Sequence, residues 1–259
     1  MQEQTYANLR VWDGIANGYV EADSVSVANG LISAVGKRDP KARDMSGLTV
    51  IPGLMDAHVH MTLDPEIPSA EEQLRQKAPE IREKMLGRAE RMVRAGLTTA
   101  RDLGGGEWLE LELRDRINRG EIVGPRLLCA GQPVTSIAGH CHFWGGESAH
   151  AADAYQVIER QREHGVDLIK IMATGGNLTR GSQPGAAQFS REETCSIVAY
   201  AKTAGYEVAA HCHGTDGIAN AAAAGVTTVE HCSWLQSDGT RGDYDPTIAA
   251  EMATRGVWV

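Results

Sequence analysis

The sequence has few aromatic residues, no surplus of positive charge and no long apolar run. Aromatic side chains make up 5% of the 259 residues, and 25 Lys and Arg against 34 Asp and Glu give a net charge of −9. This negative charge argues against nucleic acid or an anionic membrane surface as a partner. No run of about 18 apolar residues occurs, so we expect no membrane-spanning helix.

The cysteines give no sign of a disulfide framework. There are five, an odd number, and their spacing is not that of a disulfide scaffold. Cys129, Cys212 and Cys232 fall in apolar, strand-like runs, where buried and reduced thiols are expected. The N-terminal residues show neither the basic nor the apolar segment of a signal peptide. Together these absences predict a cytoplasmic protein.

Residues 1–49 predict a small β unit. Short strand-like segments, such as Leu31-Ile-Ser-Ala-Val-Gly, are separated by glycine-containing turns. Asn29-Gly30 is a strong signal for the tight turn of a β-hairpin.

From Val50 onward, strand-like and helix-like segments alternate. Glycines such as Gly96, Gly165 and Gly225 stand shortly before the next strand, as glycines that end helices do. The alternation predicts an α/β fold with a parallel sheet: about six and a half βα units of a (β/α)8 TIM-type barrel over residues 50–259, incomplete at its last strands. A doubly wound sheet is the alternative, although no Gly-x-Gly-x-x-Gly follows the first strand. The predicted strands are 50–60, 98–103, 125–131, 167–174, 207–213 and 227–233, and the predicted helices are 71–95, 107–119, 150–164, 191–204, 215–224 and 246–255.

Two histidines end the first predicted strand of this region, in Val50-Ile-Pro-Gly-Leu-Met-Asp-Ala-His-Val-His60. Residues i and i+2 of a strand point to the same face, so His58 and His60 can bind one ion together. The apolar residues before them predict a buried strand. Histidines at the end of a buried strand need either a metal or hydrogen-bond partners.

Later strands offer more residues of this kind. His211 ends Glu207-Val-Ala-Ala-His-Cys-His213, and His231 ends Thr227-Thr-Val-Glu-His-Cys-Ser233. The carboxyl ends of barrel strands are where active sites are built. The sequence therefore predicts that histidines from three strands meet at one end of the barrel.

Lys170 is unusual because it lies within the apolar run Leu168-Ile-Lys-Ile-Met172. Its ammonium could reach the surface or pair with a carboxylate such as Asp167. Alternatively, burial lowers the pKa of the amine, and a neutral amine can capture carbon dioxide as a carbamate. A carbamate would offer anionic oxygens to two divalent ions.

Six short segments, spread in order over the chain, resemble those of the amidohydrolase superfamily. Within it, they are most similar to the binuclear-zinc branch of Xaa-Pro dipeptidase-like and imidazolonepropionase-like enzymes. The segments are Pro52-Gly-Leu-Met-Asp-Ala-His-Val-His60, Gly96-Leu-Thr-Thr-Ala-Arg-Asp-Leu-Gly104, Ile169-Lys-Ile-Met-Ala-Thr-Gly-Gly176, Gln188-Phe-Ser190, Ala210-His-Cys-His213 and Glu230-His231.

The resemblance implies a role for each candidate ligand. His58 and His60 would bind the more buried of two zinc ions, and His211 and His231 the more exposed one. Lys170, as a carbamate, would bridge both ions together with a catalytic hydroxide. Nitrogen and oxygen ligands suit zinc, and manganese or cobalt could replace it.

The family also places an aspartate after the eighth strand, where it ligates metal and transfers a proton, and this sequence ends before that strand. Asp238, Asp243 and Asp245 follow the sixth strand and are expected to be solvated or helix-capping residues. The resemblance also implies that residues 1–49 are half of a composite β-sandwich. We therefore expect a further C-terminal segment or a second copy, as in a homo-oligomer, to complete the barrel.

Four residues are candidates for substrate binding. The family uses a histidine of the loop Gly139-His-Cys-His142 to contact the substrate carbonyl or carboxylate, and we favour His140 over His142, with a catalytic role. His213 stands where many relatives have tyrosine. Arg180 could bind a substrate carboxylate or face solvent.

The resemblance predicts an enzyme that cleaves the amide or peptide bond of a small molecule, a dipeptide or an N-acyl amino acid. A cyclic-amide hydrolase or deaminase is an alternative, but such enzymes usually use one metal and lack the bridging lysine, so Lys170 argues against it. A catalytically incomplete metal-binding fragment is the other alternative, because the strand-8 aspartate is absent.

Overall fold

The structure is a computed structural model that describes residues 3–67 and 69–259, so the first two residues of the N-terminal segment considered above lie outside it. The described chain divides into two compact units. The first ends at Leu54, and the second spans Met55–Val259. The division falls after the predicted boundary at residue 49. The reason is that β6 (Thr49–Val50) pairs in parallel with β2 (Arg10–Val11) of the N-terminal unit.

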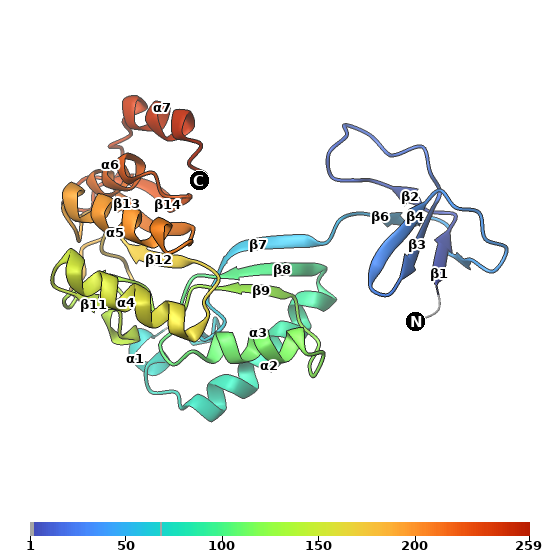
Figure 1. The fold of residues 1–259 in the computed structure, drawn as a ribbon, viewed down its shortest axis with the longest axis horizontal. Helices are drawn as coiled ribbons and strands as arrows, with labels where there is room; N and C mark the ends of the chain where they lie inside the picture. Colours follow the sequence, from blue (N-terminus) through green and yellow to red (C-terminus); the bar gives the residue numbers. More distant parts are fainter. Residues whose placement is uncertain (1–2, 68) are drawn as a thin grey trace. The chain divides into compact units, whose positions relative to one another are not determined.

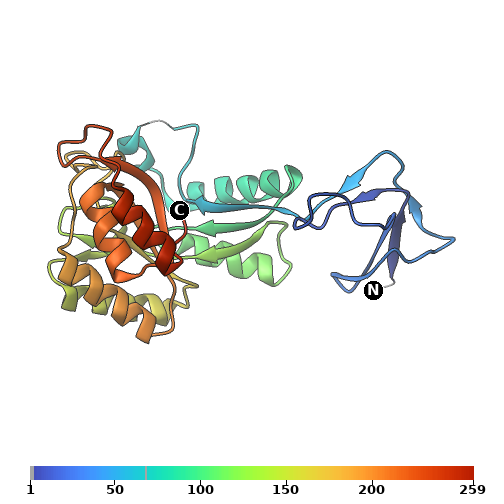
Figure 2. The same cartoon turned by 90° about the horizontal axis from the view of Figure 1, so that it is seen from above.

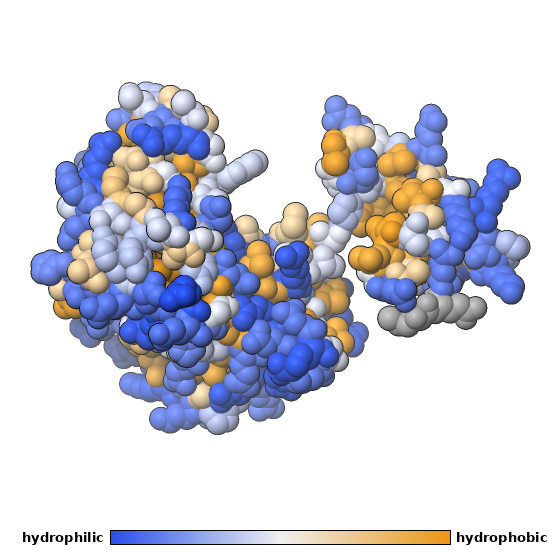
Figure 3. Space-filling view, viewed as in Figure 1, coloured by the Kyte–Doolittle hydropathy of each residue, from blue (hydrophilic) through white to orange (hydrophobic). Residues whose placement is uncertain are grey.

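The N-terminal unit is a small β structure. Its main sheet has the order β4-β3-β1-β5, formed by β1 (Gln4–Ala7), β3 (Ser24–Ala28), β4 (Leu31–Val35) and β5 (Arg43–Asp44). Asn29 and Gly30 join β3 to β4 with φ values of 52° and 77°, which confirms the predicted hairpin. Leu31 and Ile32 of β4 are exposed, and apolar surface is visible on this unit in Figure 3.

The second unit alternates strands and helices as predicted (Figures 1 and 2). Its main strands are β7 (Leu54–Val59), β8 (Leu97–Asp102), β9 (Arg126–Cys129), β12 (Ile169–Met172), β13 (Val208–Gly214) and β14 (Thr228–Leu235). Its helices are α1 (Ala70–Gln73), α2 (Ala78–Arg94), α3 (Leu109–Asn118), α4 (Ala151–His164), α5 (Arg191–Thr203), α6 (Thr215–Ala224) and α7 (Pro246–Arg255). Short elements between β9 and α4 are β10 (Thr135–Ser136), the 3-10 helix η1 (His142–Trp144) and β11 (Glu147–Ser148).

The strands follow one another in space in chain order. Two three-stranded sheets, β7-β8-β9 and β12-β13-β14, are joined through a parallel bridge between Val134 and Ile171. A further parallel bridge, between Thr228 and Trp258, begins the next strand beside β14. The carboxyl ends of β12, β13 and β14 therefore lie at one edge of the sheet, although the described strands do not close into a barrel.

Two predicted elements differ from the structure. The predicted helix 71–95 is split into α1 and α2, because Pro79 in the first turn of α2 lacks the N–H that an uninterrupted helix needs. The predicted strand 50–60 is interrupted at Pro52, and its second part, β7, lies at the edge of its sheet. The prediction that this strand is buried was wrong, since Leu54 and Met55 are 50% and 76% exposed.

The core of the second unit lies between the strands and their helices. Ile169 and Ile171 of β12, Ala210 of β13 and Ile197 of α5 belong to one buried cluster, while hydrophilic side chains cover much of the outer face in Figure 3. Within the described ranges, no helix has the length and apolar character to cross a membrane. All five cysteines are free thiols.

Candidate metal and active site

His58 and His60 leave β7 with their Nε2 atoms 3.3 Å apart. The Nδ1 of His58 lies 3.0 Å from a carboxylate oxygen of Glu230, and the Nδ1 of His60 lies 2.9 Å from the carbonyl oxygen of Gly104. Because these oxygens accept, both Nδ1 atoms carry a hydrogen, and the two facing Nε2 atoms carry lone pairs whenever the rings are neutral. Two lone pairs at this distance repel unless a cation or proton lies between them, so this pair fits a metal ion.

A second group of histidines stands at the ends of β13 and β14. The ligand atoms of His211, His213 and His231 all lie within 4.8 Å of one another. His211 donates its Nε2 hydrogen to the carbonyl of Gly175 at 3.0 Å, which leaves Nδ1 free to bind an ion. The Nδ1 of His213 is 2.8 Å from the hydroxyl of Ser233.

The backbone of β14 is irregular where it supplies His231. In a regular strand, Glu230 and His231 would point to opposite faces. His231 instead has a φ of 67°, in the left-handed region, and Cys232 follows at 47°. This local strain lets both side chains reach His58, by the hydrogen bond from Glu230 and by a ring-centroid distance of 4.8 Å from His231.

Lys170 lies in the middle of β12 with none of its surface exposed. Among the described residues, no hydrogen-bond partner lies within reach of its Nζ. Burial lowers the pKa of Lys170 to about 8, although Glu230 opposes the shift. This lowered pKa favours the neutral amine, the form that can react with carbon dioxide.

Burial favours the neutral form, which binds metal, in several histidines of this cluster. Burial lowers the pKa of His60 to about 3, and those of His140 and His231 to about 4. Burial likewise lowers the pKa of His211 well below the ordinary value. Neutral imidazoles with one protonated nitrogen are suited to divalent ions, so the donor set of this chain fits the metals that its sequence implies.

Glu230 and Arg101 belong to this cluster, and the sequence reasoning gave neither a role. Arg101 donates to Glu230 at 2.7 Å and also to the carbonyl of Ala57. Burial raises the pKa of Glu230, but the hydrogen bond from His58 and attraction to Lys170 outweigh it and lower the pKa to about 2. Glu230 could have been found from the sequence, because it is a charged residue beside the predicted ligand His231 in an apolar strand. A carboxylate buried there requires partners.

The four substrate-binding candidates are placed differently. His140 is buried, its ring lies 4.6 Å from that of His211, and its Nδ1 has no partner among the described residues. His213 lies in the histidine group described above. His142 is partly exposed and 3.9 Å from Glu147, and Arg180 is 96% exposed and 3.9 Å from Glu71. The structure therefore brings His140 and His213 to the cluster, while Arg180 faces solvent.

Asp102 braces the backbone near His60, while Asp238 and Asp245 have the solvated and helix-capping roles expected of them. Asp102 accepts hydrogen bonds from the backbone N–H groups of Met61 and Gly104, and it thereby braces the two loops on either side of His60. Asp245 caps α7, and Asp238 accepts from Thr240.

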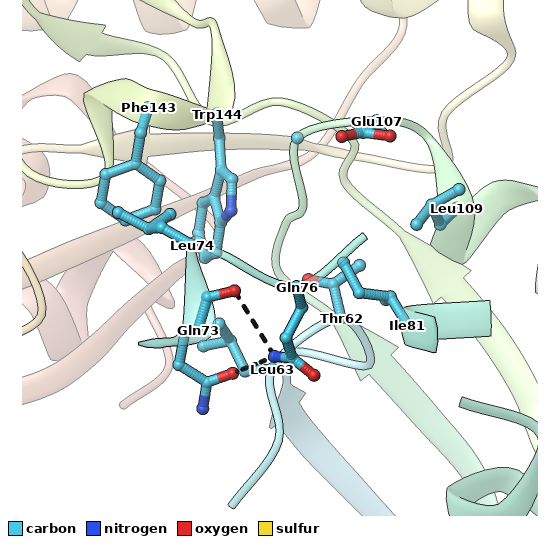
Figure 4. A pocket seen from close by; sticks show the side chains of 11 residues that line it. Thr62, Leu63, Gln73, Leu74, Gln76, Ile81, Glu107, Leu109, Phe143 and Trp144 are labelled. Atoms are coloured by element: carbon cyan, nitrogen blue, oxygen red, sulfur yellow. Dashed lines mark hydrogen bonds between the residues drawn. The ribbon is translucent and has the colours of Figure 1, made fainter. Parts of the chain in front are cut away.

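A small pocket of about 190 Å³ is lined by residues that include Thr62, Glu107 and Trp144 (Figure 4). Trp144 lines it and also packs on the ring of His60 at 5.2 Å. In Figure 4, Phe143 and Leu74 lie near Trp144, and hydrogen bonds join Gln76 to Gln73. The pocket offers both apolar surface and amide groups, but none of the histidines lines it.

An α/β fold in which imidazoles from several strands converge at one end is typical of metal-dependent hydrolases. The chain is a member of the Amidohydrolase family, whose profile matches residues 49–259. Its α/β fold, which confirms the predicted fold class, matches amidohydrolase TIM-barrel structures over about two thirds of their length, while the described strands show no closed barrel.

Several relatives are similar to this chain. It is 33% identical over 168 residues to an ochratoxinase of Aspergillus niger, an alignment that covers 55% of this chain and 34% of that protein. The structure of a Xaa-Pro dipeptidase with methionine bound in its active site matches with a TM-score of 0.85 and 26% identity, over 100% of this chain and 66% of that one. A prolidase complexed with N-methylphosphonate-L-proline matches with a TM-score of 0.86 and 25% identity, over 99% and 65% of the two chains. The chain thus spans about two thirds of these structures.

Proposed function

We propose that this chain forms the metal-binding part of a hydrolase that cleaves the amide or peptide bond of a dipeptide or an N-acyl amino acid. The observation that carries the proposal is the convergence of histidines from β7, β13 and β14 around a buried lysine that has no partner among the described residues. Support for the substrate class comes from the dipeptidase and prolidase, which bind methionine and a proline phosphonate.

In this proposal, His58 and His60 hold one divalent ion and His211 and His231 hold another, with zinc as the first candidate. The neutral amine of Lys170 can add to carbon dioxide, which forms an N–C bond, breaks one C–O π bond and one N–H bond, and releases a proton; the resulting carbamate would offer oxygen ligands to both ions. Ions bound at these residues would supply a polarised substrate carbonyl and a water molecule of lowered pKa.

The other residues bind and orient the substrate. His140, buried beside His211, offers an unpaired ring nitrogen to the carbonyl or carboxylate of the substrate. His213, held by Ser233, faces the same cluster. Trp144 covers the ring of His60 and limits the access of bulk water from that side. A cyclic-amide hydrolase is less favoured, because a single-metal site leaves the buried Lys170 without a function.

The test is to load the purified protein with zinc, to count bound ions, and to assay Xaa-Pro, Xaa-Leu and Xaa-Arg dipeptides, N-acyl amino acids and cyclic amides. We expect turnover of a dipeptide or an N-acyl amino acid, lost in His60→Asn and retained in His164→Asn, a substitution of an exposed histidine on α4. Exclusive turnover of cyclic amides would overturn the proposal. Metal binding without any turnover, also after a C-terminal segment is supplied, would favour a metal-binding chain without catalysis.

A further inference from the structure

Glu230 is a buried carboxylate that connects three strands near the facing pair of imidazoles. Its Oε2 is 3.0 Å from the Nδ1 of His58 on β7. Its Oε1 accepts from Arg101 of β8 at 2.7 Å and from Thr228 of its own strand at 2.5 Å. The two carboxylate oxygens therefore have separate partners, and only one is directed at the imidazole.

Arg101 holds this arrangement from the opposite side. Besides its bond to Glu230, its Nε donates to the carbonyl of Ala57 at 2.7 Å, immediately before His58 in the chain. The guanidinium thus fixes both the backbone that carries His58 and the carboxylate that its ring contacts. A guanidinium donates in a fixed planar geometry, which suits it to hold two acceptors at once.

The position of the hydrogen on His58 follows from these contacts. A carboxylate can only accept, so the Nδ1 of His58 must carry hydrogen, and in the neutral ring the Nε2 lone pair then faces the Nε2 of His60. We propose that Glu230, held by Arg101, is a positioning residue that fixes His58 in the Nδ1–H tautomer and directs its Nε2 at a bound metal ion. This inference rests on the proposed function, in which the point between the two Nε2 atoms is a metal site.

The tautomer of His58 can be measured in the metal-free protein. In alkaline buffer, where histidines are neutral, long-range ¹H–¹⁵N NMR correlations of ¹⁵N-histidine-labelled protein distinguish the Nδ1–H from the Nε2–H form. We expect His58, assigned from the spectrum of His58→Asn, to be the Nδ1–H form. If His58 has the Nε2–H form in the unmodified protein, the proposal is wrong, and no variant at Glu230 is needed to show it.

The variant Glu230→Gln provides the sharper test, because an amide offers one acceptor and one donor. Arg101 can only donate, so the amide oxygen is drawn to its side and the NH₂ group faces the Nδ1 of His58. We expect His58 to change to the Nε2–H tautomer and zinc affinity to fall roughly 10- to 100-fold. Glu207→Gln makes the same chemical change at an exposed residue that bonds Thr227, and both properties should stay as in the unmodified protein.

The two measurements separate this inference from the function on which it rests. If Glu230→Gln keeps both the tautomer and the zinc affinity, or changes the tautomer without weakening zinc binding, the positioning role is wrong. If the tautomer changes as expected but the unmodified protein binds no zinc, the proposed function fails while Glu230 still orients the ring. A loss of affinity without a change of tautomer would indicate a merely structural role for Glu230 and also overturn the inference.

Discussion

The ring of His211 meets the ring of His231 at 4.7 Å and 74°, although the residue in register with His211 on the neighbouring strand is Glu230. The left-handed backbone at His231 accounts for this offset. It allows β14 to supply a carboxylate to one part of the cluster and an imidazole to the other. Strain of this kind costs about 1–3 kcal/mol at a residue other than glycine, and it persists where the surroundings determine it.

Divalent metal should stabilise the folded protein. Metal bound between His58 and His60 would relieve the repulsion of their facing Nε2 lone pairs, and a ligand that binds only the folded state raises stability by mass action. We expect zinc to raise the melting temperature and a chelator to reverse the increase, while magnesium, which prefers oxygen ligands, should have little effect. His60→Asn should reduce the zinc effect, and an equal increase in that variant would contradict the assignment of His60 as a ligand.

Lys170→Ala should lower metal content from about two ions per chain toward one or fewer and abolish hydrolysis, because the proposed bridging group is removed. Bound metal is counted by elemental analysis after desalting. Short carboxylic acids should restore part of the metal content by supplying a carboxylate to the vacated space. Lys202→Ala, which changes an exposed lysine of α5, serves as the control. Two retained ions and normal turnover in Lys170→Ala would exclude a bridging role for this lysine.

His213→Asn should separate substrate binding from metal binding. A ring nitrogen of His213 lies within 4.8 Å of the ligand atoms of His211 and His231. However, the Nδ1 of His213 bonds the hydroxyl of Ser233, and the proposed ligand set is already complete with Lys170, so His213 is not needed as a metal ligand. We therefore expect KM to rise about tenfold, as for the loss of one polar contact worth about 1.4 kcal/mol, with metal content unchanged. His164→Asn is the control at an exposed site. A lower metal content in His213→Asn would make His213 a ligand instead.

Much of this site could be predicted from the sequence, because strand periodicity and position at strand ends are local properties. The alternation of His58 and His60 and the apolar run around Lys170 were enough to select these residues. The partners of those residues were not predictable in this way. Glu230 and His231 are neighbours in the chain and both reach His58 because the backbone at His231 is left-handed, and nothing in the local pattern indicates that conformation. Similarly, the exposure of Arg180 depends on the path of a long loop, which no periodic signal specifies.

Glu110 should make stability depend on pH. It is completely buried on α3 without a partner for either carboxylate oxygen among the described residues, and burial together with the nearby charge of Asp102 raises its pKa. A carboxyl group with a raised pKa binds its proton more tightly in the folded than in the unfolded state. Its contribution is therefore fully present below its unfolded pKa of about 4 and is lost as pH rises toward its folded pKa.

We expect the free energy of unfolding, measured by urea denaturation at a series of pH values, to fall between about pH 4 and neutrality by up to about 1.4 kcal/mol per pH unit for this group. Glu110→Gln should flatten this slope, because its amide does not titrate, whereas Glu107→Gln at an exposed position should leave the slope unchanged. Asp102 is also buried, and burial raises its pKa despite its two backbone hydrogen bonds. If part of the slope remains in Glu110→Gln and disappears only in the double variant with Asp102→Asn, that part of the pH dependence belongs to Asp102. An identical slope in the unmodified protein and in Glu110→Gln would show that Glu110 is not the group that holds the proton.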